Sequence, residues 1–549
     1  MLHKNFSNTS RLMKLIFRRE RVISAIWIVA LVLFSIAIAP AIGAMFPDDA
    51  GRTQFAESFN NPIMIAMMGP IYGSDNYTVG AMYGGVLLLY FVIAVAVMNI
   101  FFVVRHTRAD EERGRAEVVR ALPTGRLANI NATMLSALAL NAVLALLIGF
   151  GIAALRIESM SIEGCMVYGA ASGAAGLVFA AIAALFSQLS SNSSSANGMS
   201  FAALGLFYMI RAAGDMQGSD LISCASPLGL VLRSQTFVEN RLIPSVALLL
   251  EAVVISAVAY KLNAMRDLGQ GFISAKPGRV VARRTLLSPV GLAWRLLRTM
   301  IITWFVVMFV LGASYGTVIA DIEAFVGDSP EYLQVLGIPS EIAETMTDAY
   351  KSKIIVDYFG MFVTSIMSIV CMVPVLNAAM KARGEEREGR AEHIVSKSVS
   401  RSKYLSGYVL FAYIGSVMIQ AATAAGLYVS TASATGEANP FTLGGLMESF
   451  FVYLPAVWVM IGVGVLVIGL IPKATGVVWG LFGFVAFMSF LGQMPGLLPE
   501  WLSKVSPMTH IPRLPLDDVA AAPLIILSAV AVVLTASGFA FYSKRDTVQ

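Results

Sequence analysis

The chain has 549 residues, of which 57% are hydrophobic and only 13% are charged, and its mean hydropathy is +0.74. A soluble domain of ordinary composition carries about 25% charged residues, so the composition excludes a soluble globular protein and predicts a chain that faces lipid. The net charge of +5 is small for so long a chain and is concentrated in a few loops, so we expect no nucleic-acid partner.

The apolar runs of the first half predict helices that cross a bilayer. Each run is continuous over about 20 residues, the length of a spanning helix and roughly twice that of a membrane barrel strand. Residues 6–21 come first and are amphipathic and basic, which predicts a helix lying on the membrane surface. Six spans are then expected in chain order, at 22–44, 80–104, 130–155, 165–187, 198–213 and 244–262.

The second half repeats this plan after a basic linker. Its apolar runs predict six more spans, at 299–320, 355–380, 405–430, 446–471, 476–493 and 521–542. The expected fold is an all-α polytopic membrane protein with about twelve transmembrane helices in two parallel six-helix halves. We divide the chain into a surface helix (1–21), a first half (22–262), a linker that includes a second surface helix (263–298) and a second half (299–549).

Basic residues gather in alternate loops of this plan. Lys and Arg are enriched in 105–129, 263–298 and 381–404, whereas the intervening segments 45–79 and 321–354 are acidic or neutral. Because short cytoplasmic loops are enriched in Lys and Arg, this pattern predicts that both termini are cytoplasmic.

A charged motif occurs twice in the cytoplasmic loops. Residues 110–117 read DEERGRAE and residues 385–392 read EEREGRAE, so the tetrapeptide GRAE recurs half a chain length later. Each copy follows the second predicted span of its half. A Ser-Pro pair also precedes the last span of each half, at 226–227 and 506–507. These repeats predict a tandem duplication of a six-span unit, with both halves in the same orientation.

Each copy of the motif is expected to form a helix. Thr107 is placed to cap the first one, and Glu111–Arg115, Arg113–Glu117 and Glu386–Arg390 are spaced as i,i+4 ion pairs. A helical glycine costs about 1 kcal/mol relative to alanine, so Gly114 and Gly389 predict a close backbone approach.

A single motif of this kind is usually a solvated helix, but two equivalent copies favour docking elements for a partner with two equivalent sockets. The candidate contact residues are Asp110, Glu111, Gly114, Arg115, Glu117, Glu385, Glu386, Gly389, Arg390 and Glu392.

The sequence carries no motif for chemistry of its own. It has no phosphate-binding loop and no His or Cys spacing typical of a metal site, so we predict no catalytic, cofactor-binding or metal-binding residues. Ionisable residues in spans are costly and therefore functional candidates; here they are Glu251, Asp357 and Glu448, which either line a translocation path or lie near the hydrated outer interface. Cys165 and Cys224 fall near the same predicted outer face, where a disulfide is one alternative.

Four stretches of the chain resemble a known family of exporters. They are residues 105–126, with the first motif and PTGR behind it, LPAVWV at 454–459, Asn61-Pro62, and SPMTHIPRLP at 506–515. In this order they resemble the fused twelve-span permeases of ABC-2-type antibiotic and multidrug exporters, the tetronasin-resistance or polyketide-antibiotic exporter family. The resemblance covers nearly the whole chain.

This resemblance implies a permease in the cell membrane of a bacterium that exports hydrophobic or amphiphilic compounds. It also implies two copies of a separately encoded ATPase as partner, which would use the ATP and Mg. Residues 108–121 and 383–396 would be coupling helices, and residues 6–21 and 287–298 would be elbow helices. The second copy continues differently, with SKSVSR at 396–401 in place of ALPTGR at 121–126, which argues against equal roles.

Two other interpretations stay open on the sequence. A proton-coupled major-facilitator transporter also has twelve spans in parallel halves, and Asp110 with Arg113-Gly114-Arg115 faintly resembles its loop motif. The present loop is longer and as acidic as it is basic, which disfavours that family. A membrane scaffold without transport would explain the missing chemistry but not the repeated motif.

Overall fold

The structure is a computed structural model that describes residues 5–58, 62–273, 281–326, 348–397, 399–436, 439–491, 501, 504–514, 517 and 520–545. These residues form helices and connecting turns, with no strand among them. The chain divides into two compact units, Met1–Gly278 (unit 1) and Arg279–Gln549 (unit 2). The predicted all-α fold is confirmed.

Ten helices of the described residues are long and apolar enough to cross a membrane. The other two predicted spans, at 198–213 and 476–493, correspond to α10 (Ser193–Met216) and α22 (Gly476–Leu491). α10 carries two buried charged side chains near its end, and α22 has 16 residues, fewer than the roughly 20 that a perpendicular span needs. The chain is therefore a multi-pass membrane protein. α10 and α22 are not among its ten candidate spanning helices.

Unit 1 is built around a helix of small residues. α9 (Ile162–Leu189) packs against α5 (Val79–His106), α8 (Ala128–Ala153) and α13 (Ile243–Met265). A Cβ added at Gly169 would lie 2.3 Å from the carbonyl oxygen of Ala145 on α8. The small residues of this span therefore serve close helix packing, as small residues do in membrane interfaces.

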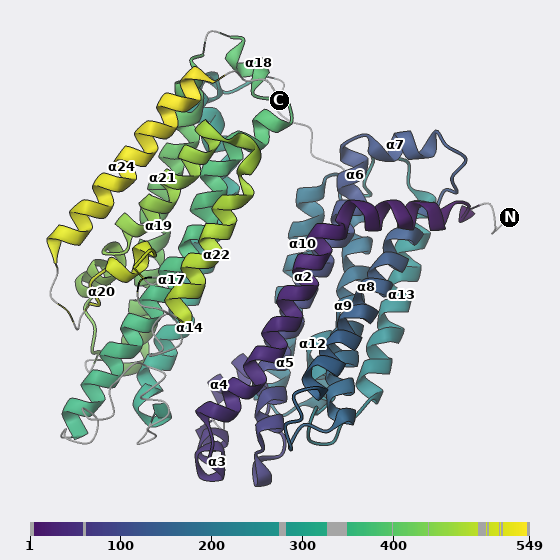
Figure 1. The fold of residues 1–549 in the computed structure, drawn as a ribbon, viewed down its shortest axis with the longest axis vertical. Helices are drawn as coiled ribbons and strands as arrows, with labels where there is room; N and C mark the ends of the chain where they lie inside the picture. Colours follow the sequence, from purple (N-terminus) through teal and green to yellow (C-terminus); the bar gives the residue numbers. More distant parts are fainter. Residues whose placement is uncertain are drawn as a thin grey trace. The chain divides into compact units, whose positions relative to one another are not determined.

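The first helix, α2 (Thr9–Met45), joins the predicted surface helix to the first span without a break. Figure 1 shows its first turns lying across one end of unit 1 before the ribbon turns to run along the other helices. Two backbone hydrogen bonds hold this start in place, from the amide of Gly125 to the carbonyl of Ser7 and from the amide of Leu127 to the carbonyl of Asn5.

The opposite end of unit 1 is closed by short helices. They are α3 (Asp49–Ser58), α4 (Pro62–Met68), η1 (Ser74–Asn76), α11 (Asp220–Cys224) and α12 (Pro227–Leu232). Arg211 of α10 is fully buried and donates to the carbonyls of Ile65 and Met67, both at 3.3 Å. Asp215 accepts from Arg233 at 2.8 Å and lies 3.6 Å from Arg211. This ion cluster fastens α4 to α10.

Unit 2 packs its long helices in close pairs. α14 (Pro289–Val326) lies against α19 (Arg401–Thr435), and α21 (Leu454–Leu470) lies against α24 (Ala521–Lys544). Each contact brings a glycine against the partner's backbone. A Cβ at Gly426 would be 2.1 Å from the Phe309 carbonyl oxygen, and one at Gly469 would be 2.4 Å from that of Gly538. The remaining elements are η2 (Arg284–Leu287), α17 (Asp348–Arg387), α18 (Glu392–Val395), α20 (Leu443–Phe451), η4 (Pro472–Ala474) and η5 (Pro507–His510).

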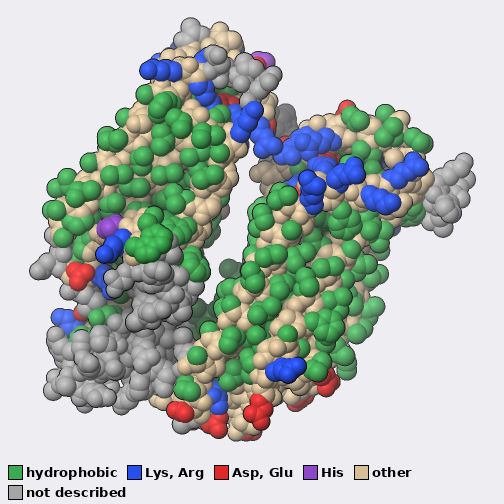
Figure 2. All heavy atoms as spheres, in the orientation of Figure 1, with side chains coloured by type: hydrophobic (Ala, Val, Ile, Leu, Met, Phe, Trp, Pro, Cys, Tyr) green, Lys and Arg blue, Asp and Glu red, His purple; other side chains and the backbone are tan. Residues whose placement is uncertain are grey.

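The surface of each unit is apolar along its helices and charged at its ends (Figure 2). Exposed side chains such as Val253 and Ile525 stand on the outer faces of α13 and α24, as expected where helices meet lipid. In unit 1, Figure 2 shows Lys and Arg gathered at the end that carries α6 (Arg108–Glu112) and α7 (Arg115–Arg120), with Asp and Glu at the opposite end.

Candidate functional site

The repeated motif breaks at its glycine in both copies. The helix predicted over 108–121 is two short helices, α6 and α7, because Gly114 adopts a φ of +70°. Gly389 adopts a φ of +74° between α17 and α18. A Cβ at either glycine would meet nothing within 4 Å. No close approach is made within the chain at either glycine; left-handed backbone, which glycine adopts without strain, explains both. A close approach to a partner at these glycines stays a prediction.

The break also changes which charges pair. Arg115 reaches back five residues to Asp110, with 3.2 Å between Nη1 and Oδ1. Arg390 makes the same connection to Glu385, with distances of 2.6 and 3.0 Å. The i,i+4 partner predicted for Arg115 was Glu111, but that carboxylate is bound by other arginines. Each copy is therefore a compact turn in which an i,i+5 ion pair bridges a left-handed glycine.

Glu111 is the anchor of the first copy. Its side chain is only 7% exposed and accepts from Arg108 at 2.8 Å and from Arg266 at 2.5 and 2.7 Å. Arg108, itself 1% exposed, also donates to the carbonyls of Ser191, Gly269 and Gln270. Glu111 thus ties α6 to Arg266 at the end of α13, and Arg108 ties α6 to the α9–α10 connection.

Glu386 has the corresponding place in the second copy. Its side chain is 4% exposed and contacts Arg383, Arg545 and the hydroxyl of Tyr542. Arg383 also donates to the carbonyl of Pro472, in the turn between α21 and α22. Arg545 follows the last helix of unit 2, as Arg266 follows the last long helix of unit 1.

A second pair of arginines closes both networks. Arg126 donates to the carbonyl of Arg266 at 3.2 Å, and Arg401 donates to the carbonyl of Arg545. Arg126 and Arg401 are separated by the same offset as the two copies of the motif. The sequences that follow the two motifs differ, yet this arginine keeps its position and its contact in both.

The first copy has an additional clamp to α2. Arg19 forms a two-point ion pair with Asp110, at 2.7 and 2.9 Å. Glu20 accepts from Arg105 at 3.0 Å and lies 3.2 Å from Nε2 of His106, which is fully buried. In the second copy, Lys381 occupies the position that corresponds to His106, and it pairs with Glu385 at 3.0 Å.

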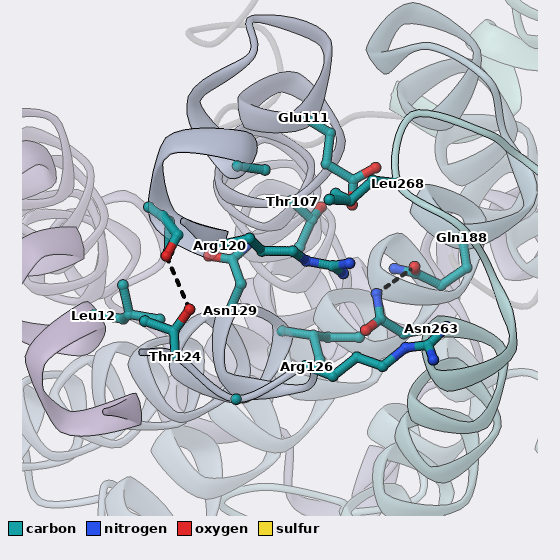
Figure 3. A pocket seen from close by; sticks show the side chains of 14 residues that line it. Leu12, Thr107, Glu111, Arg120, Thr124, Arg126, Asn129, Gln188, Asn263 and Leu268 are labelled. Carbon is teal, nitrogen blue, oxygen red and sulfur yellow. Dashed lines mark hydrogen bonds between the residues drawn. The ribbon is translucent and has the colours of Figure 1, made fainter. Parts of the chain in front are cut away.

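Figure 3 shows a small cavity next to Glu111 and Arg126, with the side chains of Arg120 and Arg126 lying among those of Thr107, Gln188 and Asn263. Burial lowers the pKa of Arg120, against the opposing effect of Glu111. The amide of Asn263 donates to Gln188 at 2.9 Å. The cavity measures about 20 Å³, room for a single water molecule. It is a polar seam between elements and cannot hold a drug-sized ligand.

The ten predicted contact residues therefore separate into anchors and an exposed set. The carboxylates of Asp110, Glu111, Glu385 and Glu386 are nearly buried in ion pairs. Gly114 and Gly389 shape the turn, whereas Arg115, Glu117, Arg390 and Glu392 are exposed. Sequence reasoning missed the exposed apolar side chains beside Glu117, which are Val118 (70% exposed) and Leu122 (59% exposed). It also missed Arg266 and Arg545, which lie far from the motifs in the chain.

A shallow groove runs beside this exposed set in unit 1. It measures about 320 Å³ and is bordered by the first turns of α2 and by α7, including Leu15, Ile16, Val118 and Val119. Arg19, Asp110 and Arg115 line the same groove. The end of unit 1 thus offers an apolar strip edged by charge, a surface suited to a protein contact.

The chain matches a family of transport proteins. The family model described as "Multidrug efflux system permease Rv1217c, C-terminal domain" matches residues 10–262 and 286–543. The chain belongs to this family. It is also 32% identical over 547 residues to the multidrug efflux system permease protein Rv1217c of Mycobacterium tuberculosis (strain ATCC 25618 / H37Rv), which covers 98% of this chain and 95% of that relative. The resemblance to ABC-2-like exporter permeases is confirmed, and the chain is a permease of a multidrug efflux family.

For a multidrug efflux permease, charged residues within spans are of special interest. Glu251 is half-buried on α13, Asp357 is half-buried on α17, and Glu448 is exposed on α20. None of the three lines the cavities described for this permease. Their assignment to a translocation path stays a prediction.

The described residues of the permease form neither a disulfide nor a metal site. Cys165, Cys224 and Cys371 are free thiols, so the disulfide considered for the first two is not formed. Burial raises the pKa of Cys224, which lies outside the spans. No cluster of His, Cys, Asp and Glu able to hold a metal ion occurs among the described residues.

Proposed function

We propose that this permease works as the membrane subunit of an ATP-driven ABC exporter of hydrophobic or amphiphilic compounds. One observation carries the proposal: two segments half a chain length apart build the same turn, with a left-handed glycine, an i,i+5 ion pair and an anchoring glutamate. Two equivalent turns suit two copies of one ATPase. ATP and Mg would bind in that partner.

The anchoring networks give each turn a stiff connection to the spans. A force that the partner applies to α7 passes to α6. From α6, Arg108 carries it to the loop between α9 and α10, and Glu111 carries it to the end of α13. Buried ion pairs resist separation, since breaking one leaves an unpaired buried charge. Closure of the ATPase dimer would therefore move whole helices and not bend the loop alone. This supports rocking of the two halves between inward-open and outward-open states.

The charge distribution supports an orientation with the turns and both termini in the cytoplasm. The Lys and Arg side chains of unit 1 gather at the end with α6 and α7 (Figure 2), and basic residues favour the cytoplasmic side. A soluble ATPase would meet the turns there. The opposite ends of the spans would then face the exterior, where an exported compound leaves.

The two turns would couple unequally. Among the described residues, only the first turn is clamped to α2, through the ion pair of Arg19 and Asp110. In the second copy, Lys381 stands at the position that His106 has in the first. A push on the first turn would pass directly to the elbow and first span. The second turn would act mainly through α17 and the end of α24.

A pull-down of the solubilised protein from its own cells tests the proposal, with ATPase activity measured on the eluate. We expect a co-purifying ABC ATPase, lost when Glu117 and Glu392 are both reversed to Lys, because both side chains are exposed on the turns. Glu158→Lys is the matched control, since Glu158 is exposed in a loop between α8 and α9.

A chain that elutes alone and drives proton-coupled transport in vesicles would overturn the ABC proposal and favour the major-facilitator alternative. A chain that elutes alone and supports no flux would leave the scaffold alternative. Retention of the ATPase by the double reversal would refute the placement of the contact on the exposed turns.

A further inference from the structure

A cavity in unit 2 lies away from the charged turns. It measures about 400 Å³, within the range of sites for small molecules. The cavity is lined by α17, α22, Tyr453 just before α21, and the segment 504–513 that contains η5. The three candidate translocation residues do not line it, and neither does any residue of the turns.

The buried wall of this cavity is rich in methionine. Met361, Met488 and Met508 are nearly fully buried, with exposed fractions of 6%, 1% and 6%. Phe362 and Tyr453 lie beside them, and the hydroxyls of Ser365 and Ser489 are the polar groups of this inner wall. Methionine is unbranched and adaptable, so a Met-rich wall accommodates apolar groups of different shape.

The rim is basic. Lys504, His510 and Arg513 border the cavity, and no Asp or Glu occurs among its described lining residues. The nearest described carboxylate in that segment, Asp517, accepts from the backbone amide of Arg513 at 2.9 Å. Among the described residues, no carboxylate pairs with the guanidinium of Arg513.

The segment that carries the rim is held in shape by its own hydrogen bonds. Nε2 of His510 donates to the carbonyl of Lys504 at 2.8 Å, and the hydroxyl of Thr509 donates to the carbonyl of Ser506 at 2.8 Å. The side chains of Lys504 and Arg513 therefore stand on a preorganised turn, which reduces the ordering cost of binding.

We infer that this cavity binds an amphiphilic anion, with its carboxylate or phosphate at Lys504 and Arg513 and its apolar body among the methionines. An amphiphilic anion of this kind can be an anionic lipid or an exported compound. Naming the anion as cargo rests on the proposed function, but the existence of the site does not.

The test measures binding of cis-parinaric acid, a fluorescent fatty acid, to the full chain in phosphatidylcholine nanodiscs without any ATPase. Its methyl ester is the uncharged counterpart. We expect the acid to bind tighter than the ester and Lys504→Gln/Arg513→Gln to weaken the acid about tenfold, which corresponds to about 1.4 kcal/mol, with the ester unchanged. Lys473→Gln/Lys544→Gln removes the same charge from exposed positions elsewhere and leaves binding unchanged.

Two results would overturn the inference: equal affinity for acid and ester, or no effect of the Lys504 and Arg513 substitutions. If phosphatidylglycerol in the nanodisc displaces the acid, the site holds a lipid anion; if it does not, the site takes the free amphiphile. Both outcomes uphold an anion site. Because the assay uses the permease alone, failure here leaves the ATPase pull-down unaffected, and failure of the pull-down leaves this site intact.

Discussion

Neutralising Glu111 should destabilise unit 1 far more than neutralising its exposed neighbour. Glu111→Gln removes the charge that Arg108 and Arg266 share at 2.5 to 2.8 Å. The two guanidinium side chains are 1% and 4% exposed, so both would be left buried without this counterion. Breaking one side of a buried ion pair costs about 3–5 kcal/mol. Glu117→Gln alters an exposed carboxylate on the same segment and should change stability by about 0.5 kcal/mol or less.

The assay is thermal unfolding of the purified protein in nanodiscs, followed by intrinsic fluorescence. At about 2–4 °C per kcal/mol for domains of 150–250 residues, Glu111→Gln should lower the midpoint by about 6 °C or more. Arg266→Gln should act on the same network, so the double substitution should cost clearly less than the sum of the singles. Equal midpoints for Glu111→Gln and Glu117→Gln, or additive losses, would refute the anchoring role.

Three further perturbations test separate parts of the structure. Gly114→Ala and Gly389→Ala should each cost about 1–2 kcal/mol, because φ is positive while the added Cβ meets nothing; Gly→Asn at each should cost less in the same melt. Gly176→Ala should destabilise the protein, since the added Cβ would lie 2.1 Å from Oδ1 of Asn141. Gly198→Ala in α10 adds a Cβ that meets nothing and should stabilise the protein by up to about 1 kcal/mol. Shifts of the melting midpoint in the same direction for both variants would contradict this. Arg211→Leu should speed hydrogen exchange in α4, whose carbonyls it binds, and the exposed Arg241→Leu should not.

The sequence by itself determined the class of protein and the place of the motif. Continuous apolar runs leave helices as the main way to satisfy backbone groups in lipid. Of the twelve spans expected from hydropathy, ten are long and apolar enough to cross a membrane in the described chain. The repeat of GRAE at a fixed offset marked both turns without any structure.

Only the tertiary structure decided what the motif residues do. A sequence pattern of i,i+4 charges predicts a continuous helix, but it does not report the sign of φ at Gly114, and that sign moves the partner of Arg115 from Glu111 to Asp110. The partners of Glu111 and Glu386 include Arg266 and Arg545, each at the far end of its own half of the chain. Such pairs depend on which helix ends lie side by side. Helix packing decides this, and local propensity does not.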